Sequence, residues 1–526
     1  MKDSKQVTFL SCPGSQSSKT IIQRGCQETS QNKEVIQRLH QCKILGGHQI
    51  DLSDLSLSVI PSNISCLHNI TTLVIYKNKL SSLPPEIGKL CNLVTILASE
   101  NSFTKLPEEM KNMKKLEILD LRHNKFTSIP CAVYELDSLR KLMLSYNKLD
   151  LIGEEISDLR NLKSLILIGN RLKNIPQAIG SLQNLELLDV AKNQIKSLPE
   201  TITDCLMLSQ LVVKYNKIEF LPKSIGNLQE LVRLNVMGNN LVTIPNSICF
   251  CTKLEDVVLH DNRLVSLPKG MLTSLPLLEN MKLSRNLIVS IPSDGPNSFK
   301  NITTINLEKN RINMIPYGIF SLARKLIKLN LNEIGLATLP FDIGKWNCIV
   351  ELSIAYNQLT NIPEDIQFLE ELEQLNVSHN QLEKLPKGIG QLKKLRILDC
   401  DGNQLTSLPA EIGSLLDLEK LYLNSNQLIS IPPQIGCLYH LSELSVSENC
   451  LKVLPDEIGH LGSLTKLMVS NNNLLQNLPV QLTLCSELKY LNIDNCPLNE
   501  IPFEFVKGGP KIVLQYLASI SPYHNI

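Results

Sequence analysis

The sequence predicts an α/β solenoid: a horseshoe of about 20 repeats, with a parallel sheet on its concave side and a helical cap at each end. Three observations lead to this prediction. A pattern of leucine and asparagine returns every 23 or 24 residues along most of the chain. Each repeat alternates apolar and variable residues over a few positions, as a short strand does. Two amphipathic segments lie where the repeats begin and end, and the exposed ends of a solenoid need such covers.

The repeat follows the pattern LxxLxLxxNxLxxLPxxIGxLxx and is of the leucine-rich type. In its LxL stretch, alternate side chains point to opposite faces, so the leucines face the core and the x residues face solvent. The asparagine can both donate to and accept from backbone groups of the turning chain. It occupies 17 of 20 such positions, and the exceptions are Leu55, Ile334 and Cys496. Terminal repeats are often atypical, but Ile334 lies within the array, and we expect a locally weakened hydrogen-bond ladder there.

The segment after the asparagine predicts the outer side of the solenoid. A Leu-Pro or Ile-Pro pair recurs in 19 repeats, with Gly153 in place of proline in the fifth. Proline suits a turn because its φ is fixed and it has no N–H to donate. The IGxL stretch that follows is expected to form a short helical or extended return. Strands on one side and bulkier returns on the other would bend the array.

The ends of the repeats define the expected domain organisation. Residues 31–48 predict an N-terminal cap helix with Val35, Ile36 and Leu39 on one stripe. Residues 49–506 form the repeats, and residues 507–526 predict a C-terminal cap helix that begins near Pro510. This helix aligns five apolar side chains: Ile512, Val513, Tyr516, Leu517 and Ile520. Residues 1–30 are rich in polar side chains and predict a disordered tail.

The sequence gives no sign of catalytic chemistry. Its histidines are scattered, no phosphate-binding glycine loop is present, and Cys249 and Cys251 have no second pair with which to bind zinc. We therefore expect a protein that is not an enzyme, with no catalytic residue, metal or cofactor. The 52 basic and 51 acidic residues exclude the basic field typical of nucleic-acid binding.

The composition also bears on location. No N-terminal apolar segment resembles a secretion signal, and no apolar run approaches the length of a membrane span. Fifteen scattered cysteines favour free thiols in a reducing compartment. We expect a cytoplasmic protein, with a nuclear location left open as well, and these observations disfavour an extracellular receptor.

The candidate function lies on the variable residues of the concave strands. Tyrosine and arginine are enriched at binding hot spots, and the N-terminal half concentrates such residues in a candidate protein-binding patch. Its members are Tyr76, Lys77, Arg122, His123, Tyr146, Lys214, Tyr215 and Arg233. The alternative is that exposed strand positions are simply polar. The C-terminal half is more acidic, which would let a partner of different charge bind there; its residues are Asp399, Asp401, Glu443, Glu448 and Asp494.

Several stretches resemble a known family. They are LDLRHNK at 119–125, NRINMIPYGIF at 310–320, NQLTNIPEDI at 357–366, CPLNEIP at 496–502 and the cap GGPKIVLQYL. Together with the order of the 24-residue steps, they resemble the Shoc-two (Sur-eight) family of Ras–Raf signalling scaffolds, from about residue 32 to 523. The resemblance implies a non-catalytic scaffold that joins a GTP-loaded Ras-type GTPase to the catalytic subunit of protein phosphatase one. This assembly dephosphorylates Raf kinases and so activates the MAP-kinase cascade; Raf would be an indirect partner.

The resemblance also assigns residues to the two partners. It implies that the GTPase contacts the concave N-terminal repeats, where Tyr76, Arg122, His123 and Arg233 match the family pattern. Ser145 and Ile168 depart from it, because the family tends to place arginine at both positions, and these departures bear on the affinity for the GTPase or on which GTPase is bound.

A short motif in the tail fits recruitment of the phosphatase. KQVTF has the form basic-x-Val-x-Phe by which such motifs dock, through Lys5, Val7 and Phe9. An extended segment of this kind adds to a sheet edge and inserts alternate side chains into apolar pockets. The alternative function is a general intracellular leucine-rich-repeat adaptor with other protein partners.

Overall fold

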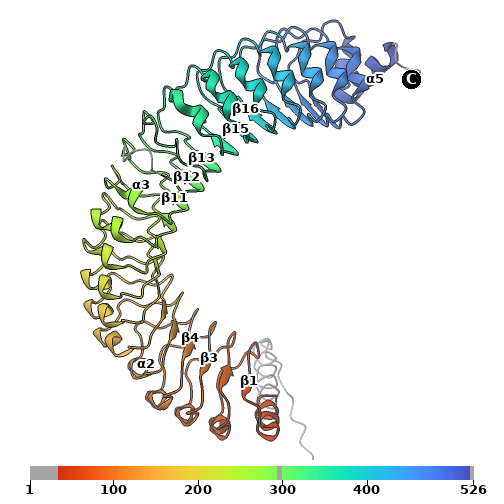
Figure 1. The fold of residues 1–526 in the computed structure, drawn as a ribbon. Coiled ribbons are helices and arrows are strands. Elements are labelled where there is room, and N and C mark those ends of the chain that lie inside the picture. Colours follow the sequence, from red (N-terminus) through yellow and green to blue (C-terminus); the bar gives the residue numbers. More distant parts are fainter. Residues whose placement is uncertain (1–33, 293–298, 522–526) are drawn as a thin grey trace, which may run out of the picture. The chain divides into compact units, whose positions relative to one another are not determined.

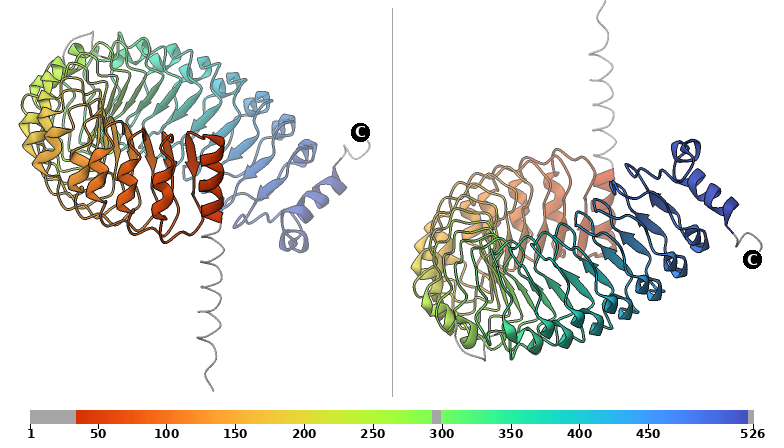
Figure 2. Two further views of the ribbon diagram at one scale, coloured as in Figure 1. Left: turned by 90° about the horizontal axis from the view of Figure 1, so that it is seen from below. Right: turned by 90° about the horizontal axis from the view of Figure 1, so that it is seen from above.

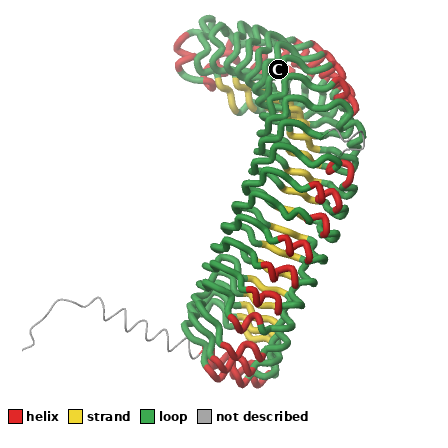
Figure 3. The backbone as a smooth tube through the Cα atoms, turned by 90° about the vertical axis from the view of Figure 1, so that its left-hand side faces the viewer, coloured by secondary structure: helices red, strands yellow, loops and turns green. Residues whose placement is uncertain are grey.

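The computed structural model describes residues 34–292 and 299–521, and these divide into two compact units with the boundary between Gln194 and Ile195. KQVTF therefore lies outside the described residues. In each unit, short strands follow one another on one side of the chain and helical turns lie on the opposite side (Figures 1 and 3). Among the described residues, no helix is long and apolar enough to span a membrane.

The first unit contains a parallel sheet in which each strand pairs with the next along the chain. Its strands are β1 Gln49–Asp51, β2 Thr72–Val74, β3 Thr95–Leu97, β4 Ile118–Asp120, β5 Lys141–Met143, β6 Ser164–Ile166 and β7 Leu187–Asp189. A first helix covers 34–45. The returns are η1 Ser62–Cys66, η2 Pro85–Lys89, η3 Glu108–Asn112, α2 Cys131–Tyr134, η4 Glu154–Asp158 and η5 Gln177–Ser181.

The second unit repeats this arrangement over more strands. They are β8 Gln210–Val212, β9 Arg233–Asn235, β10 Asp256–Val258, β11 Asn280–Lys282, β12 Thr304–Asn306, β13 Lys328–Asn330, β14 Glu351–Ser353, β15 Gln374–Asn376, β16 Ile397–Asp399, β17 Lys420–Tyr422, β18 Glu443–Ser445, β19 Lys466–Met468 and β20 Tyr490–Asn492. The returns are η6 Glu200–Asp204, η7 Ile225–Asn227, η8 Asn246–Phe250, α3 Met271–Ser274, η9 Phe341–Lys345, η10 Glu364–Phe368, η11 Lys387–Gln391, η12 Ala410–Ser414, η13 Pro433–Cys437, η14 Asp456–His460 and η15 Val480–Leu484. Two helices follow, α4 Phe503–Lys507 and α5 Pro510–Ile520.

The leucines of the repeat form the core, and the asparagines form the ladder that joins the repeats. Asn124 is typical: its Nδ2 donates to Ala98 O of the previous repeat at 3.0 Å, and its Oδ1 accepts from Phe103 N at 2.9 Å. Its side chain is buried, so these bonds satisfy backbone groups that solvent cannot reach. The residue just before the asparagine position has a left-handed backbone in every repeat, with φ between +51° and +69°.

The ladder is interrupted at Ile334, as predicted. Its side chain is buried but can neither donate nor accept. In neighbouring repeats, the asparagine accepts from the second residue after the previous asparagine position, as Asn310 does from Ile288 N. The equivalent amide here is that of Ile312, which has no acceptor among the described residues. At Cys496 the thiol keeps part of the pattern, because Sγ lies 3.1 Å from Val469 O.

The end helices bury fewer residues than the sequence predicts. In the first helix, Val35 and Leu39 are buried, but Ile36 is 51% exposed, so its assignment to the buried stripe is wrong. Figure 2 shows α5 beside the last strands of the second unit, where it packs against η15 and β20. Val513 and Leu517 of α5 are buried, whereas Ile512 and Ile520 lie on its exposed side.

Candidate partner-binding surface

In the first unit, Tyr76 and Lys77 follow strand β2. The Tyr76 side chain is exposed, and Lys77 has the left-handed backbone of its position. Lys77 Nζ lies 3.0 Å from Asp54 Oδ2 of the previous repeat. This hydrogen bond raises the pKa of Lys77, so the ammonium stays charged at this edge of the sheet.

Arg122 is held by a carboxylate that the sequence analysis missed. Its Nε and Nη2 donate to the two oxygens of Asp120, at 2.9 and 2.7 Å. Asp120, at the end of β4, is only 3% exposed, and the hydrogen bond raises the pKa of Arg122. A bidentate pair of this kind fixes the plane of the guanidinium. The sequence feature that could have revealed this pair is the aspartate two residues before Arg122, at an outward position of the strand.

His123 and Tyr146 form a stacked pair across two neighbouring repeats. Their ring centroids are 4.5 Å apart and the planes differ by 12°. The Tyr146 ring also covers Gly169 of the next repeat, where an added Cβ would lie 2.7 Å from Tyr146 Cδ1. The two positions that depart from the family pattern adjoin this pair: Ser145 is buried, and its Oγ accepts from Ile168 N at 3.2 Å.

The remaining candidates, Lys214, Tyr215 and Arg233, belong to the second unit. Tyr215 repeats the arrangement of Tyr146, because an added Cβ on Gly238 would lie 2.7 Å from its Cδ1. Arg233 is exposed at the start of β9, where it pairs in register with Gln210 and Asp256. The eight predicted residues thus form two groups, five in the first unit and three in the second.

The acidic residues of the second unit are more sheltered than the sequence suggests. Burial raises the pKa of both Asp399 and Asp401. A groove of about 370 Å³ runs over the sheet face from β12 to β17, and Asp399 and Tyr422 lie at one end of it. Burial would also raise the pKa of Glu443, but hydrogen bonds from Lys466 and Tyr422 hold it below its usual value.

The described residues contain no group of three or more His, Cys, Asp or Glu side chains that could hold a metal ion. The surroundings of the most buried thiols indicate a structural role, as Cys251 illustrates. Burial raises the pKa of Cys251 to about 12, and its Sγ donates to Ile225 O at 3.3 Å. A thiol with so high a pKa is a poor nucleophile.

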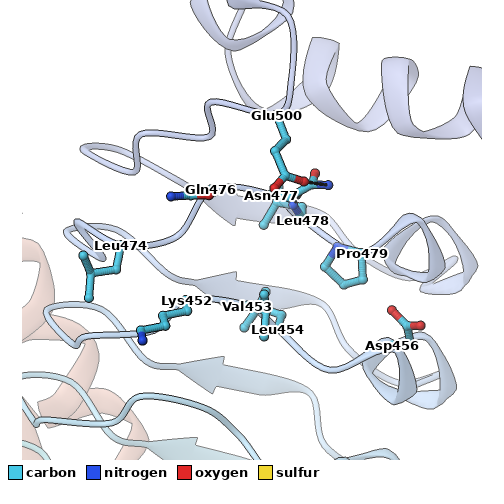
Figure 4. Close-up of a pocket in the computed structure, with 10 residues that line it drawn as sticks. All are labelled: Lys452, Val453, Leu454, Asp456, Leu474, Gln476, Asn477, Leu478, Pro479 and Glu500. Carbon is cyan, nitrogen blue, oxygen red and sulfur yellow. Dashed lines mark hydrogen bonds between the residues drawn. The ribbon is translucent and has the colours of Figure 1, made fainter.

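A pocket that the sequence did not predict lies on the flank of the last repeats (Figure 4). It measures about 620 Å³ and is lined by Lys452, Val453, Leu454, Asp456, Leu474, Gln476, Asn477, Leu478, Pro479 and Glu500. The 24-residue step between 472 and 496 was its only signal, because the extra residue falls in this loop: Leu475 fills the core, while Leu474 is 48% exposed.

Comparison with known proteins agrees with this architecture. A model described as "Leucine-rich repeat region" matches residues 21–152, and one described as "Leucine rich repeat" matches 160–218, 252–312, 349–405 and 417–474. Proteins named "Leucine-rich repeat protein soc-2 homolog" are similar over 52 residues, at 58% identity in Drosophila simulans and 56% in Drosophila pseudoobscura pseudoobscura. This segment is 10% of the present chain and 8% of those relatives.

Solved structures resemble the chain over a longer span. A leucine-rich-repeat protein of Leptospira interrogans is 29% identical with a TM-score of 0.64, over 77% of this chain and 98% of that one. The ectodomain of the Arabidopsis thaliana receptor kinase GASSHO1/SCHENGEN3, in complex with CASPARIAN STRIP INTEGRITY FACTOR 2, is 29% identical with a TM-score of 0.67, over 86% of this chain and 56% of that one. The chain therefore belongs to the leucine-rich-repeat proteins, and its likeness to the soc-2 homologues confirms the predicted resemblance to the Shoc-two family.

Proposed function

We propose that this protein is a non-catalytic signalling scaffold that binds a GTP-loaded Ras-type GTPase and the catalytic subunit of protein phosphatase one. By bringing the two together it promotes dephosphorylation of Raf and activates the MAP-kinase cascade. The likeness to the soc-2 homologues supports the family, and the exposed sheet faces of the two units supply surfaces suited to protein partners.

The observation that carries the GTPase part of the proposal is the ordered group around Arg122. The guanidinium is fixed by Asp120, and the neighbouring His123 is stacked on Tyr146. Side chains that are already ordered lose little conformational entropy when a partner binds. Arginine and tyrosine are also the residue types that dominate hot spots. Tyr76 and Lys77 of the same unit, and Lys214, Tyr215 and Arg233 of the second, are the further candidates.

The phosphatase part of the proposal rests on KQVTF. Lys5 would contribute charge, and Val7 and Phe9 would enter two apolar pockets of the phosphatase by strand addition. Because these residues precede the first helix, a partner docked on them is tethered to the repeats, which raises its effective concentration at a second contact.

Binding to GTP-loaded and GDP-loaded Ras-type GTPases tests the first part. We expect the GTP form to bind more tightly, and Arg122→Ala to weaken that binding by about tenfold or more, the range expected for a hot spot. Arg171→Ala is the matched control, since Arg171 is an exposed arginine after an asparagine position of the same unit. Equal binding of both nucleotide forms would contradict an effector role.

Capture of the phosphatase tests the second part. The double variant Val7→Ala/Phe9→Ala should lose most of the captured phosphatase, whereas Ile21→Ala/Ile22→Ala, which removes two apolar residues from the same leader, should not. Undiminished capture by the first variant would remove the role of KQVTF. If nucleotide state has no effect and phosphatase is not captured, the general adaptor becomes the better description.

A further inference from the structure

An exposed row of apolar side chains crosses the flank of the second unit, away from the sheet face. It is made by one residue from each of five consecutive repeats: Phe220, Val242, Val265, Val289 and Met314. Their exposed fractions are 58%, 38%, 43%, 49% and 66% in that order. We name this set the flank stripe.

The backbone holds the stripe in line. Val242 N donates to Glu219 O at 3.3 Å, Val265 N to Val242 O at 3.4 Å, and Val289 N to Val265 O at 3.2 Å. The three valines therefore occupy the same position in successive repeats. Phe220 and Met314 stand one position later in the repeats at either end, and their side chains are more exposed than those of the three valines.

The row ends with these five repeats, because the repeats on either side have Lys196 and Ser197, and Ala337 and Thr338, at the equivalent positions. Exposed apolar residues return at these positions only in later repeats of the unit, as Ile429 and Val453. The equivalent positions after Asn357, Asn380 and Asn403 are Thr360, Asn361, Glu383, Lys384, Thr406 and Ser407. In the first unit, the same positions of the repeats from Asn124 to Asn170 hold threonine, serine, aspartate, lysine and asparagine, and Leu151 is the one apolar residue among them. Five exposed apolar residues in adjacent repeats form a contiguous patch of the kind that marks an interaction site.

Basic side chains border the stripe on both sides. Lys217, Arg263 and Arg311 lie on the side toward the sheet, and Lys223 and Lys269 lie on the side toward the outer helices; all five are exposed. None of the five forms an ion pair within the parts of the chain that the structure describes. The nearby acids are Glu219, next to Phe220, and Glu200, whose carboxylate accepts hydrogen bonds from Lys223 N and Ser224 Oγ.

The spacing of the stripe matches the pitch of a helix. Neighbouring strands lie about 4.8 Å apart, so five repeats extend the stripe over about 19 Å. An α-helix advances 5.4 Å per turn, and its residues three and four apart lie on one face. A helix of about 13 to 15 residues laid along the stripe would therefore place one apolar side chain over each repeat.

We propose that the flank stripe is a docking site for an amphipathic helix of a partner protein, with an apolar face and acidic borders. The apolar side chains of the stripe receive the apolar face of the helix, and the five cations pair with its acidic borders. An anionic membrane fits less well, because the three valines, at 38–49% exposed, offer less apolar surface than Phe220 and Met314 at the two ends.

A stapled peptide of about 15 residues, with leucines on one face and glutamates beside them, is the probe. Its partner peptide has the same composition with the leucines scattered around the helix. Fluorescence anisotropy with the full chain should show binding of the first peptide and at least about tenfold weaker binding of the second. Binding should weaken as salt increases, because ion pairs contribute.

Variants then place the binding on the stripe. Val265→Asp should weaken binding by about tenfold or more, whereas Leu151→Asp, at an isolated exposed leucine of the first unit, should not. Arg263→Glu/Lys269→Glu changes only exposed cations and leaves the apolar side chains intact, and it should also weaken binding of the acidic peptide. Capture of the GTPase should be unaffected by all three, which separates this proposal from the proposed function.

Three results would overturn the proposal. They are equal affinity for the two peptides, an unchanged affinity in Val265→Asp, and binding to phosphatidylserine vesicles in the absence of peptide binding.

Discussion

The glycine at position 169 determines where an aromatic ring lies. It has φ of +69°, and the ring of Tyr146 occupies the space that a Cβ would take. The same arrangement occurs twice in the second unit, with Tyr215 over Gly238 and His379 over Gly402. His379 is also stacked on Tyr356, with centroids 4.2 Å apart. A missing side chain in one repeat thus orders an exposed ring in the repeat before it.

Gly169→Ala should therefore lower the free energy of unfolding by more than an ordinary glycine substitution does. A left-handed backbone costs an alanine about 1 to 2 kcal/mol, and displacing the tyrosine ring adds about 1 to 3 kcal/mol, as overpacking does. Urea unfolding followed by circular dichroism measures the loss.

Gly335→Ala is the matched control for this substitution. Gly335 has φ of +81°, but no atom lies within 4 Å of its added Cβ, so only the backbone cost remains. Equal losses for the two variants would show that the Tyr146 ring moves aside without cost.

Part of this arrangement was visible in the sequence. Tyr146, His123 and Arg122 could be selected because they stand just before asparagine positions, where strand residues leave the core. Their partners could not, because Asp120 and Gly169 become relevant only through side-chain orientation and the left-handed backbone. The repeat spacing predicts which residues are neighbours in adjacent repeats. It does not predict that the ring of one residue, such as Tyr146, covers the Cα of its neighbour, such as Gly169.

The asparagine ladder explains why each repeat stacks on the next. All of its side chains except that of Asn78 are buried, and they link backbone groups of two repeats, as Asn380 does. Asn357 accepts one more hydrogen bond than Asn403, because the ladder position before Asn357 is occupied by Ile334. Its Oδ1 accepts from both Ile334 N, at 3.1 Å, and Leu336 N, at 3.0 Å.

Asn357→Leu should destabilise the protein more than the same change elsewhere in the ladder. It leaves two buried amides without an acceptor, and each such group costs about 1 to 3 kcal/mol. Asn403→Leu is the control, since Asn403 Oδ1 accepts from Leu382 N, at 3.1 Å, and its Nδ2 makes the same kinds of bonds. We expect Asn357→Leu to exceed it by about 1 kcal/mol or more in the free energy of unfolding. If Asn403→Leu costs as much, the second amide contributes nothing.

The secondary structure of the repeats was predictable in kind but not in detail. The LxL pattern predicts the strands, and proline marks where each return begins. The sequence left the returns open between helical and extended, and most are short 3-10 helices preceded by proline. The buried faces of the end helices were predicted less well, because periodicity alone put Ile36 on the stripe of Val35. Only the packing partner decides which side of a short helix is covered.

Taken together, the chain presents two kinds of surface: sheet faces with ordered aromatic and basic side chains, and a flank stripe in the second unit. The 52 basic and 51 acidic side chains nearly balance, so long-range attraction does not select a partner, and local groups must do so. Replacements within such a group are therefore the sharpest test of the proposed function.

Ile168→Arg should increase the affinity for a GTP-loaded Ras-type GTPase. Ile168 is half-buried in the first unit, directly before Gly169, so an arginine there would lie beside the Tyr146 ring and restore a residue type that the resembled family tends to have. Basic charge speeds association with a partner surface of opposite charge, so we expect about a threefold to tenfold gain that decreases with salt. Surface plasmon resonance with the GTP and GDP forms measures this gain in affinity.

Asn174→Arg is the control, because it adds the same charge at an exposed flank position of the same repeat and should change the affinity little. Equal gains for the two variants would indicate a general charge effect, and no gain for Ile168→Arg would show that the family's arginine is not what limits binding here.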